Sequence, residues 1–410
     1  MPDIQLKNLY GSVNTYDNIK KIRVPNAVDP DEYVEYFNQS LLQTKDVYYT
    51  SNGDTTISAD SPYVGLSNIN VHISVAGPGG GGDVIGLIMG TVSGSVTYEG
   101  VRTVRDYCFY ECSQVEEMYL PDCVGKIGNY AFYNCSNLTT LSLPIYSSVA
   151  YRNEFVFNGC SKLSEFKGGG IYGKYAFADC SNLSIAYIGC GGDGILNFDH
   201  SELCTKMFQN CSSLKRIEFT ANGAIVSDAA IKLGYSNAAE GMFASCSALE
   251  EAPNFVISQV GYNDMGACMP NNMFYGCTSL KSVTAYCGMT SNIAGSFNIG
   301  SSAFYKCNSM SVATFYLSPV GVNTTSSMSL YLGANAFAYC SSLFSLYFKV
   351  PNTATGGLTV GSINNAFVAT PITSSVGGVY GSVFVPSRFL SKFKQAWSAI
   401  SNRIVADPTE

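Results

Sequence analysis

The chain of 410 residues is 46% hydrophobic and only 13% charged, and its formal net charge is −7. Low charge combined with 28 Tyr and 23 Phe favours a β-rich, well-buried fold and argues against disorder. The acidic balance leaves no basic stripe for a phosphate backbone, so we expect no nucleic-acid partner. Because the chain has only two histidines, His72 and His200, zinc binding and acid–base catalysis are both disfavoured.

The N-terminal region, residues 1–76, carries two short β signatures and is predicted to be a separate β-rich attachment module. The run GPGGGG (77–82) is predicted to be a flexible linker, and residues 77–100 as a whole lead into the next domain. A phosphate-binding role for these glycines is disfavoured because no Lys-Ser/Thr or dinucleotide pattern follows them. The first residues do not resemble a signal peptide, and no apolar run is long enough for membrane insertion.

A Phe-x-x-Cys pair recurs along the rest of the chain and indicates a repeat architecture. The nine pairs are Phe109/Cys112, Phe132/Cys135, Phe157/Cys160, Phe177/Cys180, Phe208/Cys211, Phe243/Cys246, Phe274/Cys277, Phe304/Cys307 and Phe337/Cys340. A tenth copy keeps Phe367 but has Thr370 at the cysteine position. Successive phenylalanines lie 20 to 35 residues apart. Since the pattern within each copy is constant, every copy is predicted to form the same structural unit.

A strand is predicted after each cysteine, where apolar residues stand at relative positions 0, 3 and 5, as in Leu138, Leu141 and Leu143. The last two positions alternate as the inward residues of a half-buried strand do. A single copy cannot bury its apolar edge, whereas stacked copies share one core. The pattern therefore predicts a solenoid of about ten repeats over residues 101–385, with one parallel strand per repeat.

The string IGNYAFYNCSNLTTLSLP (127–144) resembles the core of the BspA-type leucine-rich repeat, Ile-x-x-x-Ala-Phe-x-x-Cys-x-x-Leu-x-x-Leu-x-Leu-Pro. The resemblance extends over residues 101–385 and implies a β-rich leucine-rich-repeat solenoid. From the fifth copy onward the repeats are longer, because segments such as 220–240 and 317–335 add residues. Insertions in solenoids often emerge on one face and carry binding.

The recurring cysteines allow three interpretations: disulfides, metal ligands or buried packing residues. Neighbouring strands lie about 4.8 Å apart, which a disulfide tolerates, but identical side chains in a stack do not converge. We therefore interpret the ladder as reduced, inert thiols in tight inward turns. His200 and Cys204, near Asp193 and Asp199, are a metal candidate that no second His or C-x-x-C supports. We expect neither a metal nor a cofactor.

The residues at relative position 4 of each strand are predicted to face outward from the sheet. They are Tyr119, Ser142, Lys167, Tyr187, Glu218, Pro253, Thr284, Thr314 and Tyr347. Adding Arg216 at position 2, the candidate binding residues are Tyr119, Lys167, Tyr187, Arg216, Glu218 and Tyr347. Such a mixed surface with scattered tyrosines suits protein or glycan recognition, and the loops 221–240, 256–272 and 288–301 are equally good candidates. No catalytic residue is assigned, because no histidine accompanies a nucleophile.

The C-terminal residues 386–410 are predicted to form a helical cap over the last repeat. Ser387 is the expected N-cap. The apolar residues at helical spacing are Phe389, Phe393, Trp397, Ile400 and Ile404. A helix with this apolar face would cover the edge that the last repeat otherwise exposes.

The N-terminal region is similar to tail-associated proteins of phages of Gram-positive bacteria, through residues 1–26 and through SNGDTTISAD…VGLSNINVHISV (51–75). It departs from that family at Gly65, which lacks the preceding aspartate. Together with the repeats, the resemblance implies a non-enzymatic host-binding protein of a phage virion. Its partners would be tail or baseplate proteins and a host-surface protein or glycan. A BspA-like adhesin of the bacterial cell surface and, less favoured, a hydrolase decorated by the solenoid stay open as alternatives, as does homo-oligomerisation.

Overall fold

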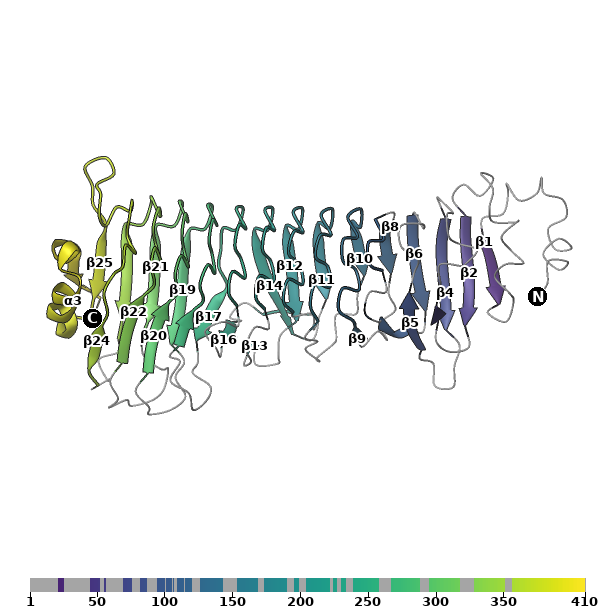
Figure 1. The fold of residues 1–410 in the computed structure, drawn as a ribbon, viewed down its shortest axis with the longest axis horizontal. Helices are drawn as coiled ribbons and strands as arrows, with labels where there is room; N and C mark the ends of the chain where they lie inside the picture. The colour runs from purple at the N-terminus through teal and green to yellow at the C-terminus, as the bar shows by residue number, and fades with distance from the viewer. Residues whose placement is uncertain are drawn as a thin grey trace, which may run out of the picture. The chain divides into compact units, whose positions relative to one another are not determined.

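The computed structural model describes residues 21–25, 45–51, 55–56, 69–75, 82–86, 94–99, 101–104, 106, 109–113, 115–119, 126–142, 153–168, 173–189, 195–198, 204–221, 224–226, 230–233, 239–257, 267–287, 295–317, 328–350 and 356–409. Two compact units are present: residues 1–189, the N-terminal unit, and residues 190–410, the C-terminal unit. Within each unit, parallel strands lie side by side and are joined by tight turns (Figure 1). Across the described ranges, we find no helix with the length and apolar character that crossing a membrane requires.

The N-terminal unit contains two parallel sheets. The strands of the first sheet, in pairing order, are β1 (Lys21–Pro25), β2 (Lys45–Ser51), β4 (Ile69–Val75), β6 (Gly94–Glu99), β8 (Val115–Tyr119), β10 (Thr140–Ser142), β11 (Glu165–Gly168) and β12 (Ile185–Gly189). The strands of the second are β3 (Thr55–Thr56), β5 (Gly82–Gly86), β7 (Val101–Val104) and β9 (Lys126–Ile127). Parallel pairing of β4 with β6 and of β6 with β8 runs across the predicted boundaries at residues 76 and 100. The boundaries themselves stay predictions.

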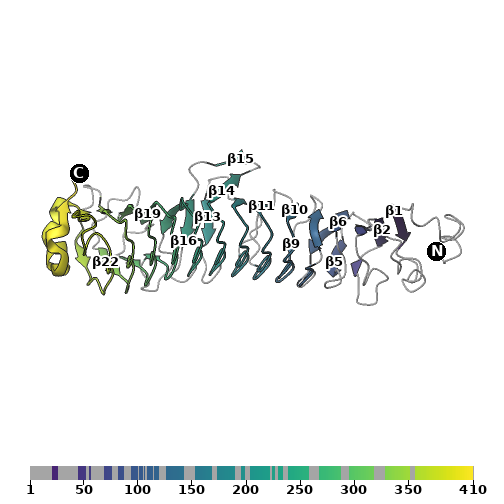
Figure 2. The ribbon, with the colours of Figure 1, turned by 90° about the horizontal axis from the view of Figure 1, so that it is seen from above.

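The C-terminal unit contains two parallel sheets and a hairpin. The strands of its first sheet, in pairing order, are β13 (Ile195–Phe198), β16 (Ala230–Leu233), β17 (Asn254–Ile257), β19 (Ser282–Cys287), β21 (Val312–Tyr316), β23 (Ser345–Lys349), β25 (Ser382–Val385) and β26 (Ile404–Ala406). Those of its second sheet are β18 (Ala267–Met269), β20 (Gly295–Ile299), β22 (Met328–Leu332) and β24 (Leu358–Val360). The antiparallel hairpin of β14 (Arg216–Ala221) and β15 (Ala224–Ile225) projects away from the other strands of this unit (Figure 2).

The second sheet of the C-terminal unit differs from the expectation of one strand per repeat. Here the residues that lengthen the repeats supply an additional strand before each turn, so that β20 precedes the Phe304 turn and β21 follows it. Strands β20 and β22 pair in parallel over five residues, and their Phe297 and Leu330 side chains are fully buried. The extra residues in these strands therefore enlarge the core.

The core of each unit is built on a stack of the recurring phenylalanines. In the N-terminal unit the ring centroids from Phe109 to Phe177 follow one another at 4.9, 5.1 and 5.3 Å. In the C-terminal unit the stack runs from Phe208 to Phe367 with spacings of 5.1 to 5.7 Å. Because burying one phenylalanine stabilises a fold by about 1.5–3 kcal/mol, this row is a major source of stability. It also keeps successive repeats at a nearly constant spacing.

The turn before each cysteine contains two residues with positive φ, a backbone conformation that residues other than glycine seldom adopt. Tyr130 and Asn134 have φ values of 55° and 56°, and the same two positions have positive φ in the other described turns. Hydrogen bonds between neighbouring turns hold this conformation. The amide of Phe132 donates to the carbonyl of Val156 at 2.8 Å, and the amide of Asn134 donates to that of Asn158 at 2.7 Å. The strain is therefore offset only when repeats stack.

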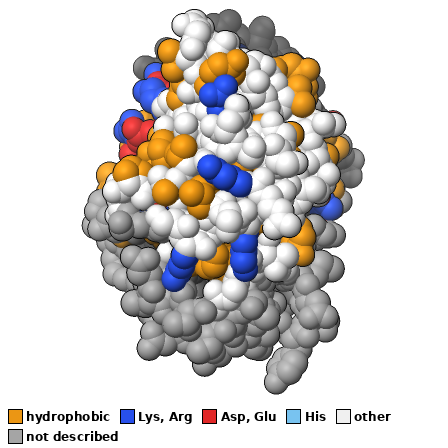
Figure 3. Space-filling view, turned by 90° about the vertical axis from the view of Figure 1, so that its left-hand side faces the viewer, with side chains coloured by type: hydrophobic (Ala, Val, Ile, Leu, Met, Phe, Trp, Pro, Cys, Tyr) orange, Lys and Arg blue, Asp and Glu red, His pale blue; other side chains and the backbone are white. Residues whose placement is uncertain are grey.

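The C-terminal cap departs from the predicted single helix. It consists of η3 (Ser387–Phe389), α3 (Leu390–Ala396) and η4 (Ser398–Arg403), followed by β26, which pairs with β25. Ser387 begins η3 without a side-chain cap, so its N-cap assignment is wrong, and Ile404 lies in β26 instead of on a helical face. All five predicted apolar residues are nonetheless buried. Figure 3 views the molecule from the end that carries this cap, where Lys and Arg side chains stand between apolar patches.

Candidate binding surface

The nine cysteines of the ladder are buried free thiols, and those from Cys135 to Cys180 and from Cys246 to Cys340 donate to the phenylalanine carbonyl of the preceding repeat. The thiol of Cys160 donates to the Phe132 carbonyl at 3.1 Å, and that of Cys277 donates to the Phe243 carbonyl at 3.0 Å. Burial raises the pKa of both thiols, which keeps them protonated and therefore able to donate. Thr370 is buried as well, but its hydroxyl donates within its own repeat, to the carbonyl three residues earlier at 2.8 Å.

Other members of the ladder are equally far from the surface, among them Cys112, Cys180, Cys211 and Cys340. The thiols of Cys180 and Cys340 donate to the carbonyls of Phe157 and Phe304, at 3.1 and 2.9 Å. The backbone amides of Cys112 and Cys211 each donate to the carbonyl three residues earlier, at 3.1 Å. None of these four residues is more than 1% exposed. The structure thus places them in the core and not at a binding surface, where a ligand could reach them.

The metal candidate of the sequence falls mostly outside the described residues, because His200, Asp193 and Asp199 all lie there. Cys204 is described and is fully buried. Within the described ranges, no group of three or more His, Cys, Asp or Glu residues is arranged to hold a metal ion.

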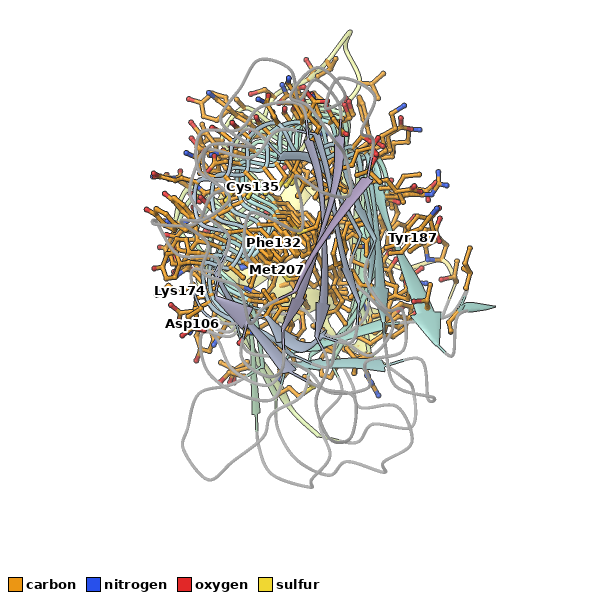
Figure 4. All side chains as sticks on the ribbon, turned by 90° about the vertical axis from the view of Figure 1, so that its right-hand side faces the viewer. Asp106, Phe132, Cys135, Lys174, Tyr187 and Met207 are labelled. Atoms are coloured by element: carbon orange, nitrogen blue, oxygen red, sulfur yellow. The ribbon has the colours of Figure 1, made fainter. Side chains whose placement is uncertain are left out.

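In the N-terminal unit, charged and aromatic side chains share the outward face of the sheet. Lys167 lies opposite Tyr187 in the pairing of β11 with β12. Its Nζ is 5.3 Å from the centroid of the Tyr187 ring and 3.1 Å from Oε2 of Glu165. In the view along the strand stack, Tyr187 lies on the outer side of the sheet, whereas Phe132 and Cys135 point into the interior (Figure 4). Two predicted candidates are thus in contact, although an exposed ion pair such as this one contributes little energy.

Three other predicted candidates lie elsewhere. The Tyr119 backbone belongs to β8, but its side chain lies outside the described residues. Arg216 and Glu218 point to the same side of β14, where Nε of the arginine is 2.5 Å from Oε1 of the glutamate. Each thus neutralises the other on the strand that leads into the projecting hairpin.

The outward residues of β19, β21, β23 and β25 form three straight rows, because these strands pair without a register shift. The rows are Ser282, Val312, Ser345 and Ser382; Thr284, Thr314, Tyr347 and Phe384; and Tyr286, Tyr316 and Lys349. We call this set the hydroxyl–aromatic face. All of its side chains are exposed or half-buried, whereas those alternating with them, such as Val283 and Leu346, are buried. The face is therefore flat, regular and open to solvent.

The aromatic rings of the hydroxyl–aromatic face are stacked on one another. Tyr286 and Tyr316 have centroids 4.7 Å apart and nearly parallel planes at 10°, and Tyr347 stacks on Phe384 at 4.4 Å and 12°. Each ring covers one face of its partner, so the tyrosine hydroxyls and ring edges remain available to a ligand. Because neighbouring rings restrict each other's rotamers, little side-chain entropy remains to be lost on binding.

The single charge of the hydroxyl–aromatic face is neutralised by the cap. Nζ of Lys349 is 3.4 Å from Oδ2 of the buried Asp407 and 3.0 Å from the hydroxyl of Thr409. Burial alone raises the pKa of Asp407, but hydrogen bonds from Thr409 and the Lys349 charge outweigh it, so this pKa lies below its usual range. The carboxylate is thus ionised at neutral pH, and the face as a whole is close to neutral.

The repeat pattern predicts only part of this face. Tyr347 was among the candidates, whereas Tyr286 and Tyr316 occupy relative position 6, where the same alternation continues because β19 and β21 extend further than expected. One neighbouring prediction is wrong: Pro253 was expected outward and is buried. Glu251 bridges to Ser282, but Phe255 pairs with Ala285, so one extra residue reverses the alternation in between.

Stacked copies of one turn-and-strand unit, a phenylalanine core and a flat outward sheet define a leucine-rich-repeat protein. Residues 94–197, 195–342 and 257–374 match the BspA type leucine rich repeat region, with six copies. These ranges cover more than half of the chain, which therefore belongs to the BspA-type leucine-rich-repeat family.

Three solved structures are similar to the chain at low identity. A leucine-rich repeat protein from Bacteroides ovatus shares 18% identity, covering 75% of this chain and 88% of its own, with a TM-score of 0.27. A leucine rich cell surface protein from Faecalibacterium prausnitzii shares 18%, covering 74% and 91%, with a TM-score of 0.26. A leucine-rich repeat protein from Eubacterium ventriosum shares 16%, covering 79% and 82%, with a TM-score of 0.30. Scores this low do not bear on function, and no curated protein matches the chain.

Proposed function

We propose that the chain is a non-enzymatic adhesion protein of the bacterial cell surface, which recognises its ligand through the hydroxyl–aromatic face. Membership of the BspA-type family supports the class of function, because its proteins are typically surface adhesins. The observation that carries the choice of surface is the row geometry, in which Tyr286, Tyr316 and Tyr347 are held in stacks on an open, flat sheet. Tyrosines fixed in this way give a large contact area at a small entropic cost.

The composition of this face favours binding over catalysis. Its side chains are hydroxyls, aromatic rings, one valine and one lysine, with no carboxylate, histidine or thiol among them. The lysine is already paired with the ionised Asp407, whose Oδ2 lies 3.4 Å from its Nζ. Hydrolysis needs an acid–base pair or an activated nucleophile across a cleft, and a flat neutral face offers neither.

A cell-binding assay tests the proposal. Fluorescently labelled chain is applied to intact bacterial and epithelial cells and counted by flow cytometry, beside the triple variant Tyr286→Ala/Tyr316→Ala/Tyr347→Ala. We expect the wild type to bind at least one cell type and the triple variant to lose at least tenfold in affinity, a size typical of interface hot spots. The matched control is Tyr275→Ala/Tyr305→Ala, which removes a stacked tyrosine pair from the turns, away from the sheet. Equal binding by the wild type and both variants would show that the hydroxyl–aromatic face is not the recognition surface.

A phage tail-associated protein is the second candidate, favoured by the similarity of residues 1–26 and 51–75 to such proteins. In this case the N-terminal region would attach to tail or baseplate proteins, and the same sheet face would bind the host. Antibodies against the chain distinguish the two locations. Labelling of the surface of intact producing cells supports the adhesin, whereas labelling confined to purified virions supports the tail protein.

A further inference from the structure

We infer that the hydroxyl–aromatic face binds a neutral polysaccharide whose chain lies along the three rows, across strands β19 to β25. This inference rests on the proposed recognition function and specifies the chemical class of its ligand. Three properties of the face carry it: its charge, its periodicity and the groups that remain open for hydrogen bonding.

The charge of the face selects against ionic ligands. The chain as a whole has a net charge of −7, and the only cation of the face, Lys349, is already paired with Asp407. An anionic polymer would find no free cation here and would be repelled by the rest of the chain, while a cationic ligand would find no free carboxylate. A neutral ligand is neither repelled by the negative chain nor dependent on a free charge of the face.

The periodicity of the face matches a linear polymer. Parallel strands repeat about every 4.8 Å, and identical side chains stand on adjacent strands in the pairs Thr284/Thr314, Tyr286/Tyr316 and Ser345/Ser382. A polysaccharide also presents the same groups at regular steps along a line, so several sugar units can make equivalent contacts at once. The surface of an ordinary globular protein, unlike that of a repeat protein, has no such translational repeat, and we therefore favour the polymer.

The open polar groups of the face are hydroxyls. Among the described residues, no protein group hydrogen-bonds the phenol oxygens of Tyr286, Tyr316 or Tyr347. Since stacking covers one face of each ring, a sugar meets the ring edges and these oxygens, together with the serine and threonine hydroxyls of the neighbouring rows. Hydrogen bonds to these hydroxyls are therefore expected to contribute to recognition.

The first experiment measures binding of the full chain to soluble polysaccharides by affinity electrophoresis and isothermal titration calorimetry. The neutral probes are β-glucan, mannan, xylan and galactan, and the anionic probes are polygalacturonate and hyaluronate. We expect at least one neutral polymer to bind, its oligosaccharides binding more tightly with length until they span the four strands. Binding to none of the neutral probes, or tighter binding to an anionic one, overturns the inference.

The second experiment removes only the hydroxyls. Tyr286→Phe/Tyr316→Phe keeps the stacked rings and should weaken binding of the neutral polymer about tenfold, the effect of one or two lost hydrogen bonds. The control Tyr275→Phe/Tyr305→Phe makes the same chemical change in the turns and should bind like the wild type. Unchanged binding by the Tyr286/Tyr316 variant contradicts the inference.

Failure of the inference and failure of the proposed function give different results. If the triple alanine variant loses cell binding but the neutral polysaccharides neither bind nor compete, the ligand is not a neutral glycan and the recognition function stands. If cell binding is unchanged in that variant, the face is not the recognition surface and both proposals fail.

Discussion

The short repeats around Phe157 and Phe177 share their turn with the long repeats around Phe274 and Phe304, but they differ outside it. Twenty residues separate the first two phenylalanines and thirty the second two, yet the ring centroids are 5.3 and 5.5 Å apart. In both cases the thiol of the second repeat donates to the carbonyl of the preceding phenylalanine at 3.1 Å. The stacking geometry is therefore independent of repeat length.

Outside the turn, the two kinds of repeat diverge. On β11 and β12 of the short repeats the outward face carries the exposed pair Glu165 and Lys167, whereas on β19 to β25 of the long repeats it carries hydroxyls and aromatic rings. In the long repeats the strands that precede the turns also pair with one another, for example β20 with β22. The turn thus determines how repeats stack, which leaves strand surfaces and connections free to change chemistry.

The largest expected effect tests the shared part of this comparison. Phe157→Ala and Phe274→Ala each remove a fully buried ring from the middle of its stack, and each should lower the free energy of unfolding by about 3–5 kcal/mol. Urea denaturation followed by fluorescence measures the change. Tyr275→Ala, in the same turn but 38% exposed, is the control and should cost only about 0.5–1.5 kcal/mol, through its stacked partner Tyr305. If the losses in unfolding free energy for Phe157→Ala and Phe274→Ala differ by more than about 2-fold, the stacking is not independent of repeat length.

The next effect concerns the one charge of the long-repeat face. Asp407→Asn removes the buried carboxylate that Lys349 and Thr409 contact and should cost about 1–3 kcal/mol at pH 7. Because its pKa is lowered in the folded state, Asp407 stabilises the fold above its unfolded pKa of about 4, and this contribution is lost as the pH falls through the folded pKa.

Urea denaturation at pH 7 and at pH 3 measures this difference between wild type and variant, which should shrink at the lower pH. The control is Glu250→Gln, which breaks an exposed pair with Lys281 and should leave the free energy of unfolding nearly unchanged at pH 7. An Asp407→Asn effect that is the same at both pH values would show that the charge is unimportant.

The same division between turn and surface explains what the sequence could predict. The repeat and its buried cysteines could be predicted because each repeated position meets the same environment in every copy. The five apolar cap residues could be predicted from their helical spacing. The outward positions face solvent, so their residue types vary from copy to copy. The sequence pattern therefore does not predict that Phe384, which follows the irregular tenth copy, belongs to this face. Pro253 was misplaced because a single extra residue between Glu251 and Phe255 reverses inside and outside, and no local signal indicates it.

The smallest stability effect tests whether the thiol ladder matters equally in both kinds of repeat. Cys160→Ala and Cys277→Ala each remove one S–H donor from a phenylalanine carbonyl that still accepts a backbone hydrogen bond from its own repeat, at 3.2 and 3.1 Å. Because the carbonyl keeps one partner, each variant should lose only about 1 kcal/mol, less than either phenylalanine variant. The urea midpoint measures this loss.

The reactivity of the thiols gives an independent check on the same ladder. Because burial raises their pKa, Cys160 and Cys277 should react with a thiol reagent only after unfolding, and at the same rate as unfolding itself. Fast labelling of native Cys277 alone would mean that the extra strands of the long repeats open locally. The turn would then be less independent of repeat length than the matching ring spacings indicate.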